Sequence, residues 1–172
     1  MPRSRQISFI DERDYQMVAL ACMGFSFERT IMLKTQLLHP TILQVLGASG
    51  HGSGILIADG NYPFITRANP AAERVYLNFM PGILTVTQVL EGLVTAIPIE
   101  AAHVMTPADG SDQPIFSEFR KLLPGLELQK LGRFEFYDMA RGSDISLVVA
   151  TGEQRIYANI LLTIGVVPPP VS

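Results

Sequence analysis

The chain of 172 residues has no tryptophan, one cysteine and only 17% charged residues. The single cysteine, Cys22, excludes an internal disulfide and any metal site built from cysteines, so a reducing, cytoplasmic setting is expected. The formal net charge is −3, and acidic and basic residues are interspersed. The sequence therefore offers no basic face for nucleic acid or for an anionic membrane surface.

Long apolar runs are lacking as well. The most apolar stretch near the start, Tyr15–Phe27, is shorter than the roughly 20 apolar residues that a membrane span requires. It follows Asp11, Glu12 and Asp14, where a secretory signal peptide would carry positive charge. We interpret the stretch as a short buried helix, or as a segment that precedes the true start of the protein.

The sequence does have enough apolar residues, 48%, to build the core of one domain. Short apolar runs alternate with segments of helical periodicity. Strands are expected at residues 54–58, 74–79, 100–106, 144–151 and 159–165. Helices are expected at residues 40–50, 85–97, 112–123 and 133–143. Strands separated by such helices predict a single-domain, three-layer α/β/α sandwich with a largely parallel central sheet.

Candidate functional residues follow from the loops of such a sheet, because functional groups collect where its strands end. His51 lies in the segment "GHGSG", where glycines let the backbone approach a ligand and leave the imidazole as the main side chain beside Ser53. Asp59 follows the expected strand at 54–58, either as a turn former or as a ligand-binding group. A lone histidine among glycines is equally compatible with a structural role.

Three further polar residues suit the binding of a polyol. Tyr157 and Asn159 stand two apart as a strand is expected to begin, which places both side chains on one face. A phenol can stack on a sugar and an amide can pair with hydroxyls, although a sheet-surface pair is the alternative. Arg133 offers several donors to hydroxyls, or covers apolar surface with its stem.

Several stretches carry a resemblance to a known family. They are "MLKTQLLHPTILQVLGASGHGSGILIADGNYP", "PGILTVTQVLEGL", "RFEFYDMA" and "VVATGEQRIYANILLTIGVV". On these motifs the chain resembles the D-ribose pyranases and L-fucose mutarotases from residue 32 to 167. Three features bring it closer to the fucose mutarotase branch. These are "GHG" in place of the ribose branch's His-Thr-Asp, the "RFEFY" motif and a short middle region. Residues 1–31 form an extension of unknown role, and residues 168–172 a tail.

The resemblance implies an isomerase that interconverts the anomers of a free monosaccharide, most simply L-fucose, without a metal or another cofactor. It gives His51 the role of the catalytic histidine and Asp59 that of a substrate-binding aspartate. Arg133, Tyr157 and Asn159 match the arginine, tyrosine and asparagine of the family's motifs. It further implies a ring-like homo-oligomer, often a decamer, with sites near subunit contacts.

Two departures from the family pattern leave the substrate open. Ser53 stands where fucose mutarotases often carry aspartate, and "FYDMARGS" replaces "FYERARKA". D-ribose pyranase activity would use nearly the same groups. A non-catalytic sugar-binding or structural ring protein is an alternative of another class, which the intact set of five residues disfavours. His39, beside a proline that opens a helix, and His103, within an apolar strand, are interpreted as structural.

The chemistry of mutarotation favours a histidine. Ring opening removes a proton from the anomeric hydroxyl and delivers one to the ring oxygen, and histidine, with a pKa of about 6.5, exchanges protons in both senses near neutrality. An extended strand rises about 3.3 Å per residue, so His51 and Asp59 would lie roughly 20 Å or more apart. Either the glycine-rich loop folds back along the strand or one site is built across two subunits, and we favour the second arrangement.

Overall fold

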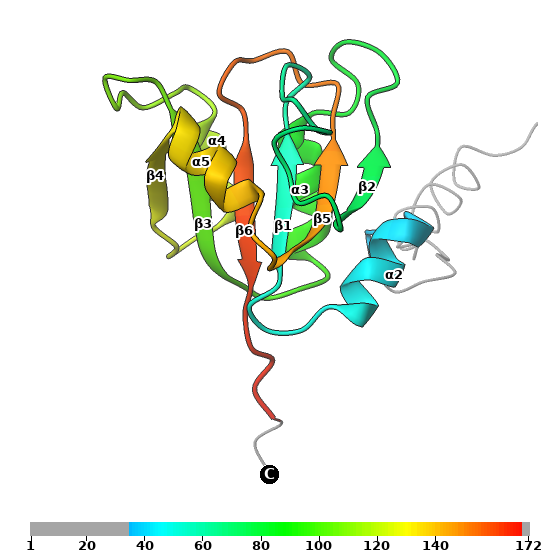
Figure 1. Cartoon of the computed structure of the whole chain (residues 1–172). Coiled ribbons are helices and arrows are strands. Elements are labelled where there is room, and N and C mark those ends of the chain that lie inside the picture. Colours follow the sequence, from blue (N-terminus) through cyan, green and yellow to red (C-terminus); the bar gives the residue numbers. More distant parts are fainter. Residues whose placement is uncertain (1–34, 170–172) are drawn as a thin grey trace, which may run out of the picture. The chain divides into compact units, whose positions relative to one another are not determined.

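A computed structural model describes residues 35–169, which form a six-stranded sheet flanked by helices (Figure 1). Residues 1–34, which include Cys22 and the Tyr15–Phe27 stretch, lie outside the described residues. The strands are β1 (Gly54–Ala58), β2 (Glu73–Tyr76), β3 (Ile99–Thr106), β4 (Leu128–Gly132), β5 (Ile145–Ala150) and β6 (Ile160–Ile164). The helices are α2 (Pro40–Ala48), α3 (Val86–Val94), α4 (Phe116–Leu122) and α5 (Arg133–Ala140).

The sheet has the strand order β2-β5-β1-β6-β3-β4. β1 and β2 each pair in parallel with β5, and β3 pairs in parallel with β4. β6 is antiparallel to both β1 and β3, so every described strand except β6 runs in one direction. The ends of these parallel strands define the carboxyl edge of the sheet, at the top of Figure 1, and their starts define the amino edge. The predicted α/β fold with a largely parallel sheet is confirmed.

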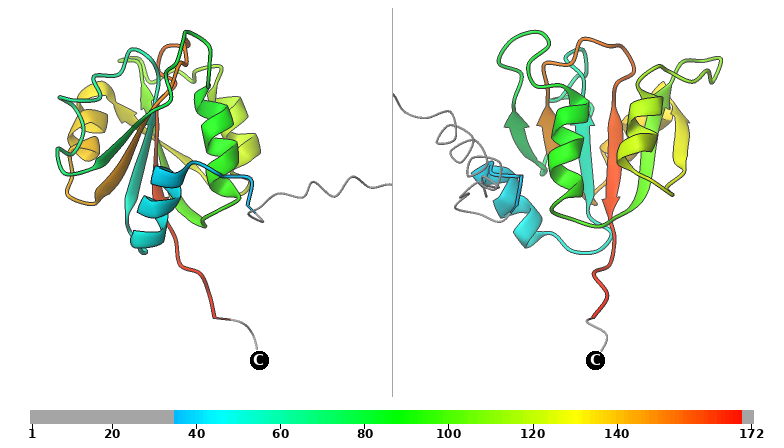
Figure 2. Two further views of the ribbon diagram at one scale, coloured as in Figure 1. Left: turned by 90° about the vertical axis from the view of Figure 1, so that its right-hand side faces the viewer. Right: turned by 180° about the vertical axis from the view of Figure 1, so that it is seen from behind.

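The helices cover both faces of the sheet, which gives the three layers (Figure 2). α3 and α4 pack on one face, and α5 packs on the other. β1 shows the consequence for its sequence: Ile55 and Ile57 belong to one core, while Leu56 and Ala58 belong to the other. Because both sides of the strand are buried, the run "GILIA" is apolar throughout instead of alternating.

Local side-chain bonds set where the helices begin. Thr85 precedes α3 and forms a capping box, in which its hydroxyl accepts from the Gln88 amide at 3.3 Å and the Gln88 side chain accepts from the Thr85 amide at 2.9 Å. His39 precedes α2, and its Nδ1 accepts from the Ile42 amide at 3.4 Å. Pro40 then occupies the first turn of α2, where the missing amide hydrogen costs nothing.

Some predicted elements differ from the structure. No strand was expected at β4, which pairs only with β3 at the end of the sheet and exposes much of its length, so it lacks a diagnostic apolar run. The helix expected at 112–123 begins only at Phe116, after turns around Pro114. The strand expected at 74–79 ends at Tyr76, because its partner β5 ends at Ala150. No helix among residues 35–169 is long and apolar enough to cross a membrane.

Gly152 fixes the loop that follows β5 against the segment 80–84. Its amide donates to the Leu84 carbonyl at 3.0 Å, and its carbonyl accepts from the Gly82 amide at 2.6 Å. A methyl group at this position would lie 2.5 Å from the Met80 carbonyl oxygen and would clash with the Ile83 carbonyl. The chain tolerates only glycine here without a backbone shift.

We expect Gly152→Ala to lower the free energy of unfolding by about 1–3 kcal/mol, the usual cost of forcing atoms into a packed site. Urea unfolding followed by circular dichroism measures this change. Gly47→Ala is the matched control, since nothing lies within 4 Å of its added methyl group. Gly47 is in α2, where alanine is favoured, so the control should unfold at the same or higher urea concentration. Equal midpoints for Gly152→Ala and the wild type would contradict the prediction.

Candidate functional site

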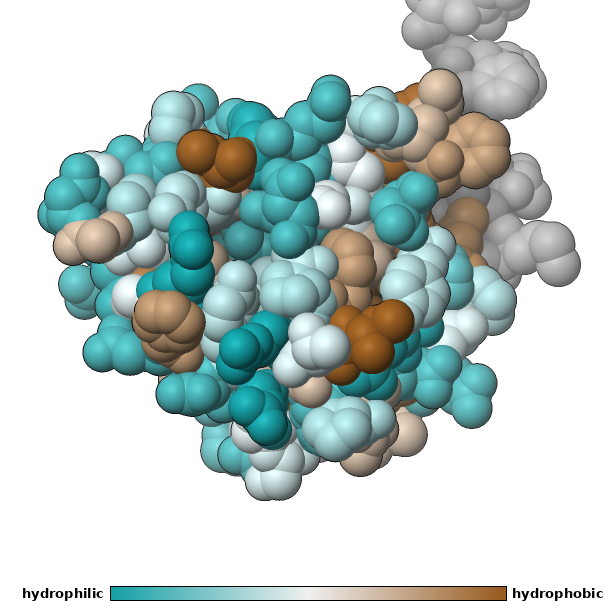
Figure 3. Space-filling model, turned by 45° about the horizontal axis from the view of Figure 1, so that its top comes forward, coloured by the Kyte–Doolittle hydropathy of each residue, from teal (hydrophilic) through white to brown (hydrophobic). Residues whose placement is uncertain are grey.

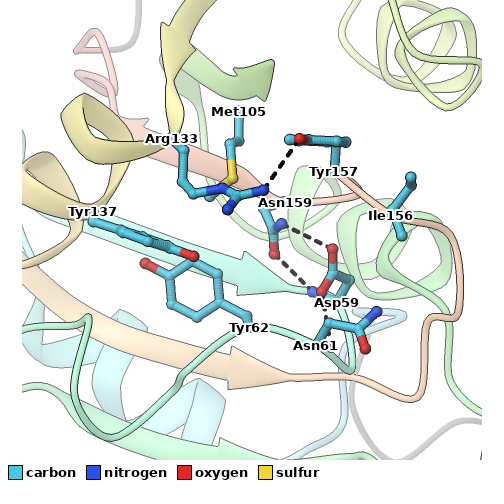
Figure 4. Close-up of a pocket in the computed structure, with 9 residues that line it drawn as sticks. All are labelled: Asp59, Asn61, Tyr62, Met105, Arg133, Tyr137, Ile156, Tyr157 and Asn159. Carbon is cyan, nitrogen blue, oxygen red and sulfur yellow. Dashed lines mark hydrogen bonds between the residues drawn. The ribbon is translucent and has the colours of Figure 1, made fainter. Parts of the chain in front are cut away.

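A pocket of about 420 Å³ opens at the carboxyl edge of the sheet (Figure 4). Its walls come from the segment after β1, the end of β3, the start of α5 and the segment before β6. This volume falls in the range of about 300–1,000 Å³ that is typical of small-molecule sites. The lining residues are Asp59, Asn61, Tyr62, Met105, Arg133, Tyr137, Ile156, Tyr157 and Asn159.

A buried pair of polar side chains forms the floor of the pocket. The Asn159 amide nitrogen donates to Asp59 Oδ2 at 2.9 Å, and the Asn159 side-chain oxygen accepts from the Asp59 backbone amide at 2.9 Å. The Asn61 backbone amide donates to Asp59 Oδ1, also at 2.9 Å. Asp59 thus forms the turn expected of its sequence and still has acceptor capacity on both oxygens, because a carboxylate offers about four lone-pair sites.

Burial is the main influence on the acidity of Asp59. The residue is only 2% exposed, and desolvation raises the pKa of its carboxyl group above the ordinary value. Hydrogen bonds from Asn61, Asn159 and Ala158 act in the opposite direction, and the nearby charge of Glu153 raises the pKa further. The protein therefore holds this carboxylate in the pocket at a cost in stability when it is ionised.

This raised pKa predicts a pH dependence of stability that belongs to Asp59. The folded state binds the proton more tightly than the unfolded chain, whose aspartates have a pKa of about 3.9. The contribution is therefore fully present below about pH 3.9 and is lost as pH rises through the folded-state pKa. We expect the free energy of unfolding of the wild type, relative to Asp59→Asn, to fall over this window. Denaturant unfolding of both proteins at several pH values measures the difference, and a constant or rising difference would contradict the assignment.

Arg133 and Tyr157 form the rim of the pocket. Arg133 Nη2 donates to the Tyr157 hydroxyl at 3.2 Å, and its guanidinium lies 6.0 Å from the centre of the Tyr157 ring. Arg133 is the first residue of α5, where the Glu135 side chain accepts from the Gly132 amide at 2.9 Å and fixes the start of the helix. The pair presents a stacking face and several donors to the pocket.

The sequence predicts that a strand begins at Tyr157 and Asn159, but neither residue lies in a strand. β6 starts only at Ile160, and Tyr157 has a φ of 58°, the only positive φ of a non-glycine residue within 35–169. A left-handed conformation is uncommon for a bulky residue and costs energy. A turn, and not the two-residue repeat of a strand, brings both side chains to the pocket.

An ion-pair network supports the turn that carries Tyr157. Arg155 donates to Glu153 from Nη2 at 2.8 Å and from Nε at 3.0 Å, and its Nη1 lies 2.6 Å from Glu118 of α4. Glu153 is 4% exposed; burial alone would raise the pKa of its carboxyl group, but the hydrogen bonds from Arg155 bring the pKa below its usual value. Arg155 therefore ties this turn both to Glu153 and to Glu118 of α4.

His51 lies away from this pocket. It precedes β1 at the amino edge, whereas Asp59 follows β1 at the carboxyl edge. Its side chain is 59% exposed, and its Nε2 lies 2.9 Å from Oε2 of Glu100, near the start of β3. The structure thus brings together Asp59, Arg133 and the Tyr157–Asn159 turn. It leaves His51 at the opposite edge of the sheet. The glycine-rich loop does not fold back along β1.

The aromatic wall of the pocket was not predicted from the sequence. Tyr62 and Tyr137 meet edge to face with ring centres 5.5 Å apart, and the Tyr62 hydroxyl donates to the Arg67 carbonyl at 2.6 Å. Tyr137 stands four residues after Arg133 on α5, so helical spacing alone places both on one side of the helix. That spacing could have identified Tyr137. Within residues 35–169, no three His, Cys, Asp or Glu side chains are grouped to hold a metal ion.

Together, the fold and the pocket define an α/β domain with a pocket of small-molecule size where parallel strands end. The family model described as the RbsD / FucU transport protein family matches residues 32–167, and the chain belongs to this family. The resemblance carried by the sequence motifs is thereby confirmed.

Relatives from both branches of the family are similar to this chain. The fucose mutarotase of Mus musculus is 33% identical over 146 residues, which cover 76% of this chain and 90% of the relative. A D-ribose pyranase of Paracidovorax citrulli is 33% identical over 135 residues, which cover 78% and 98%. The crystal structure of the fucose mutarotase in complex with L-fucose from Streptococcus pneumoniae superposes with a TM-score of 0.65 at 28% identity, covering 76% of this chain and 94% of that one.

Proposed function

We propose that the protein is a monosaccharide mutarotase, an isomerase that interconverts the anomers of a free sugar, with L-fucose as its substrate. The observation that carries this proposal is the pocket at the carboxyl edge, which combines the buried polar pair Asp59 and Asn159 with a rim formed by Arg133 and Tyr157. The family and the names of the relatives in both branches support the same reaction class.

The pocket residues divide the recognition of a sugar between them. The free lone pairs of Asp59 accept from hydroxyl groups, and Arg133 donates to hydroxyl oxygens. Tyr157 covers an apolar face of the ring. Asn159 keeps Asp59 in place through two hydrogen bonds, one donated to its carboxylate and one accepted from its backbone amide. These four residues bind and orient the substrate.

The reaction itself requires two proton transfers and one reversible bond cleavage. A base takes the proton of the anomeric hydroxyl, the bond from C1 to the ring oxygen breaks, and an acid protonates the ring oxygen, which gives the open-chain aldehyde. Rotation about the C1–C2 bond and closure on the other face of the carbonyl give the second anomer. His51 is the general acid and base, with water or a polar pocket group handling the other proton.

His51 reaches the sugar from a neighbouring subunit. Within one chain the length of β1 separates His51 from the pocket, so a complete site needs the amino edge of one copy against the carboxyl edge of another. Both edges have exposed apolar residues suited to such a contact. Figure 3, which turns the carboxyl edge forward, shows apolar side chains among polar ones. Exposed apolar residues include Phe79, Ile83 and Ile156 in segments at the carboxyl edge, and Val166 and Val167 after β6 at the amino edge.

A contact between two different edges is heterologous and closes into a ring when its rotation permits. The proposal therefore includes a homo-oligomeric ring, such as a decamer, with sites at the subunit contacts. Sedimentation velocity measures the assembly directly. An active monomer would overturn the shared site.

D-ribose pyranase activity is the second candidate, because a D-ribose pyranase is as similar in sequence as a fucose mutarotase. Saturation-difference NMR at equilibrium separates the two candidates, since it follows exchange between the anomer signals of L-fucose and between the pyranose and furanose signals of D-ribose. Faster exchange mainly for L-fucose supports the proposal, and faster ribose exchange alone moves the protein to the other branch. No acceleration by the folded protein for either sugar would overturn the proposed activity and favour a non-catalytic sugar-binding or ring protein.

A further inference from the structure

The side chain of Glu100 contacts His51 at the amino edge of the sheet. Glu100 Oε2 lies 2.9 Å from His51 Nε2, and the two residues are 49 positions apart in the chain. The Glu100 side chain is 40% exposed, so its charge does not need the histidine as a partner to be solvated. A surface pair of this kind contributes little to stability, which directs attention to its effect on the imidazole.

Two features of the backbone aim Glu100 at this position. The pairing of β3 with β6 shifts register between Ile99 and Ala101, so Glu100 sits at a bulge. A bulge re-aims a side chain that a regular strand would direct elsewhere, and bulges are frequent next to active sites. Gly165 leaves the necessary room, because a methyl group there would lie 3.3 Å from the Glu100 Cβ.

The loop that carries His51 is anchored to β6. The Gly52 amide donates to the Ile164 carbonyl at 2.9 Å, and the Ile164 amide donates to the Ser53 carbonyl at 2.9 Å. Gly52 has a φ of 83°, which glycine adopts without strain. β6 therefore fixes both the loop of His51 and, through its bulged pairing with β3, the position of Glu100.

The loop itself supplies no carboxylate to the histidine. Ser53 stands two residues after His51, and its hydroxyl accepts from the Gly50 amide at 3.3 Å. The charge beside the imidazole comes instead from β3. We propose that Glu100 is a positioning residue for His51: its carboxylate accepts a hydrogen bond from the Nε2–H group and leaves Nδ1 as the nitrogen that exchanges protons with the sugar.

This inference rests on the proposed function, and it gives Glu100 two effects on the reaction. It holds one tautomer and one ring orientation, because the hydrogen bond of one ring nitrogen determines which nitrogen is free. It also stabilises the imidazolium that forms whenever Nδ1 takes a proton, since a hydrogen bond between charged groups is about twice as strong as a neutral one. Glu100 touches neither the sugar pocket nor the groups that line it.

The test compares kcat and KM for Glu100→Gln with those of the wild type, using the anomer exchange of L-fucose and of D-ribose. We expect kcat to fall about tenfold or more with KM nearly unchanged, the range for a lost hydrogen bond to a charged group. Glu100→Asp keeps the charge and should recover part of kcat. Glu91→Gln on the exposed side of α3 is the matched control and should leave both constants unchanged.

A double-mutant cycle separates positioning from any general effect of the variant. In a His51→Asn background, Glu100→Gln should change the residual rate little, because the group through which it acts is gone. An unchanged kcat in Glu100→Gln, or an equal loss in both backgrounds, overturns the role of Glu100 and leaves the mutarotase proposal intact. A folded wild type that accelerates neither sugar overturns both proposals.

Discussion

Replacing His51 by asparagine should lower the rate of anomer exchange by about 10²–10⁴, the usual contribution of a positioned acid and base. Asparagine keeps polarity and approximate size at the base of the side chain but cannot exchange a proton near neutrality. The imidazole lies on an exposed loop at the amino edge, so the fold should be unaffected. Exchange of the L-fucose anomers by saturation-difference NMR gives the rate, and thermal unfolding checks the fold.

His39 provides the matched control for the loss of an imidazole. It stands at the start of α2, where its Nδ1 accepts from the Ile42 amide. Asparagine is a favoured residue at this position of a helix, so His39→Asn should preserve both the helix and the activity. Retention of most of the activity by His51→Asn would remove His51 from the mechanism, and Asp59, with its raised pKa, would become the first group to examine.

The sequence was most informative where local pattern and burial coincide. β1 is buried on both faces, so its uninterrupted apolar run marked it clearly. The rise per residue of that strand also predicts the separation of His51 from Asp59. The exposed edge strand β4 has no such pattern, and only its pairing with β3 makes it a strand.

The site was partly beyond the reach of sequence reasoning because its geometry depends on distant segments. The residue type does not indicate the left-handed conformation of Tyr157, since tyrosine rarely adopts a positive φ. The contact of Glu100 with His51 depends on a bulge between β3 and β6 that no local pattern indicates. The family motifs identify the residues individually. Which of them lie together in one pocket depends on the order and direction of the strands in the sheet.

The separation of the candidate groups on one chain leads to a prediction about mixtures. Chains with His51→Asn retain an intact pocket, and chains with Asp59→Ala retain an intact histidine. If each site combines the histidine of one subunit with the pocket of the next, each variant alone is inactive, but mixed rings contain complete sites. Random mixing in equal amounts should restore about a quarter of the wild-type activity, since both contributions must be intact at a heterologous contact.

The experiment co-expresses the two variants with different affinity tags and purifies rings that carry both tags, whose L-fucose exchange is then measured by NMR. The matched control mixes Asp59→Ala with Asn159→Ala. These residues hydrogen-bond to each other within one pocket at 2.9 Å, so no arrangement of these subunits yields a complete pocket and the mixture should stay inactive. Inactive mixed rings of the first pair would place the whole reaction within one chain. Recovery near a quarter, with a silent control, would instead mean that β1 acts as a spacer, holding the acid/base of one site and the binding groups of the next at opposite edges of a single sheet.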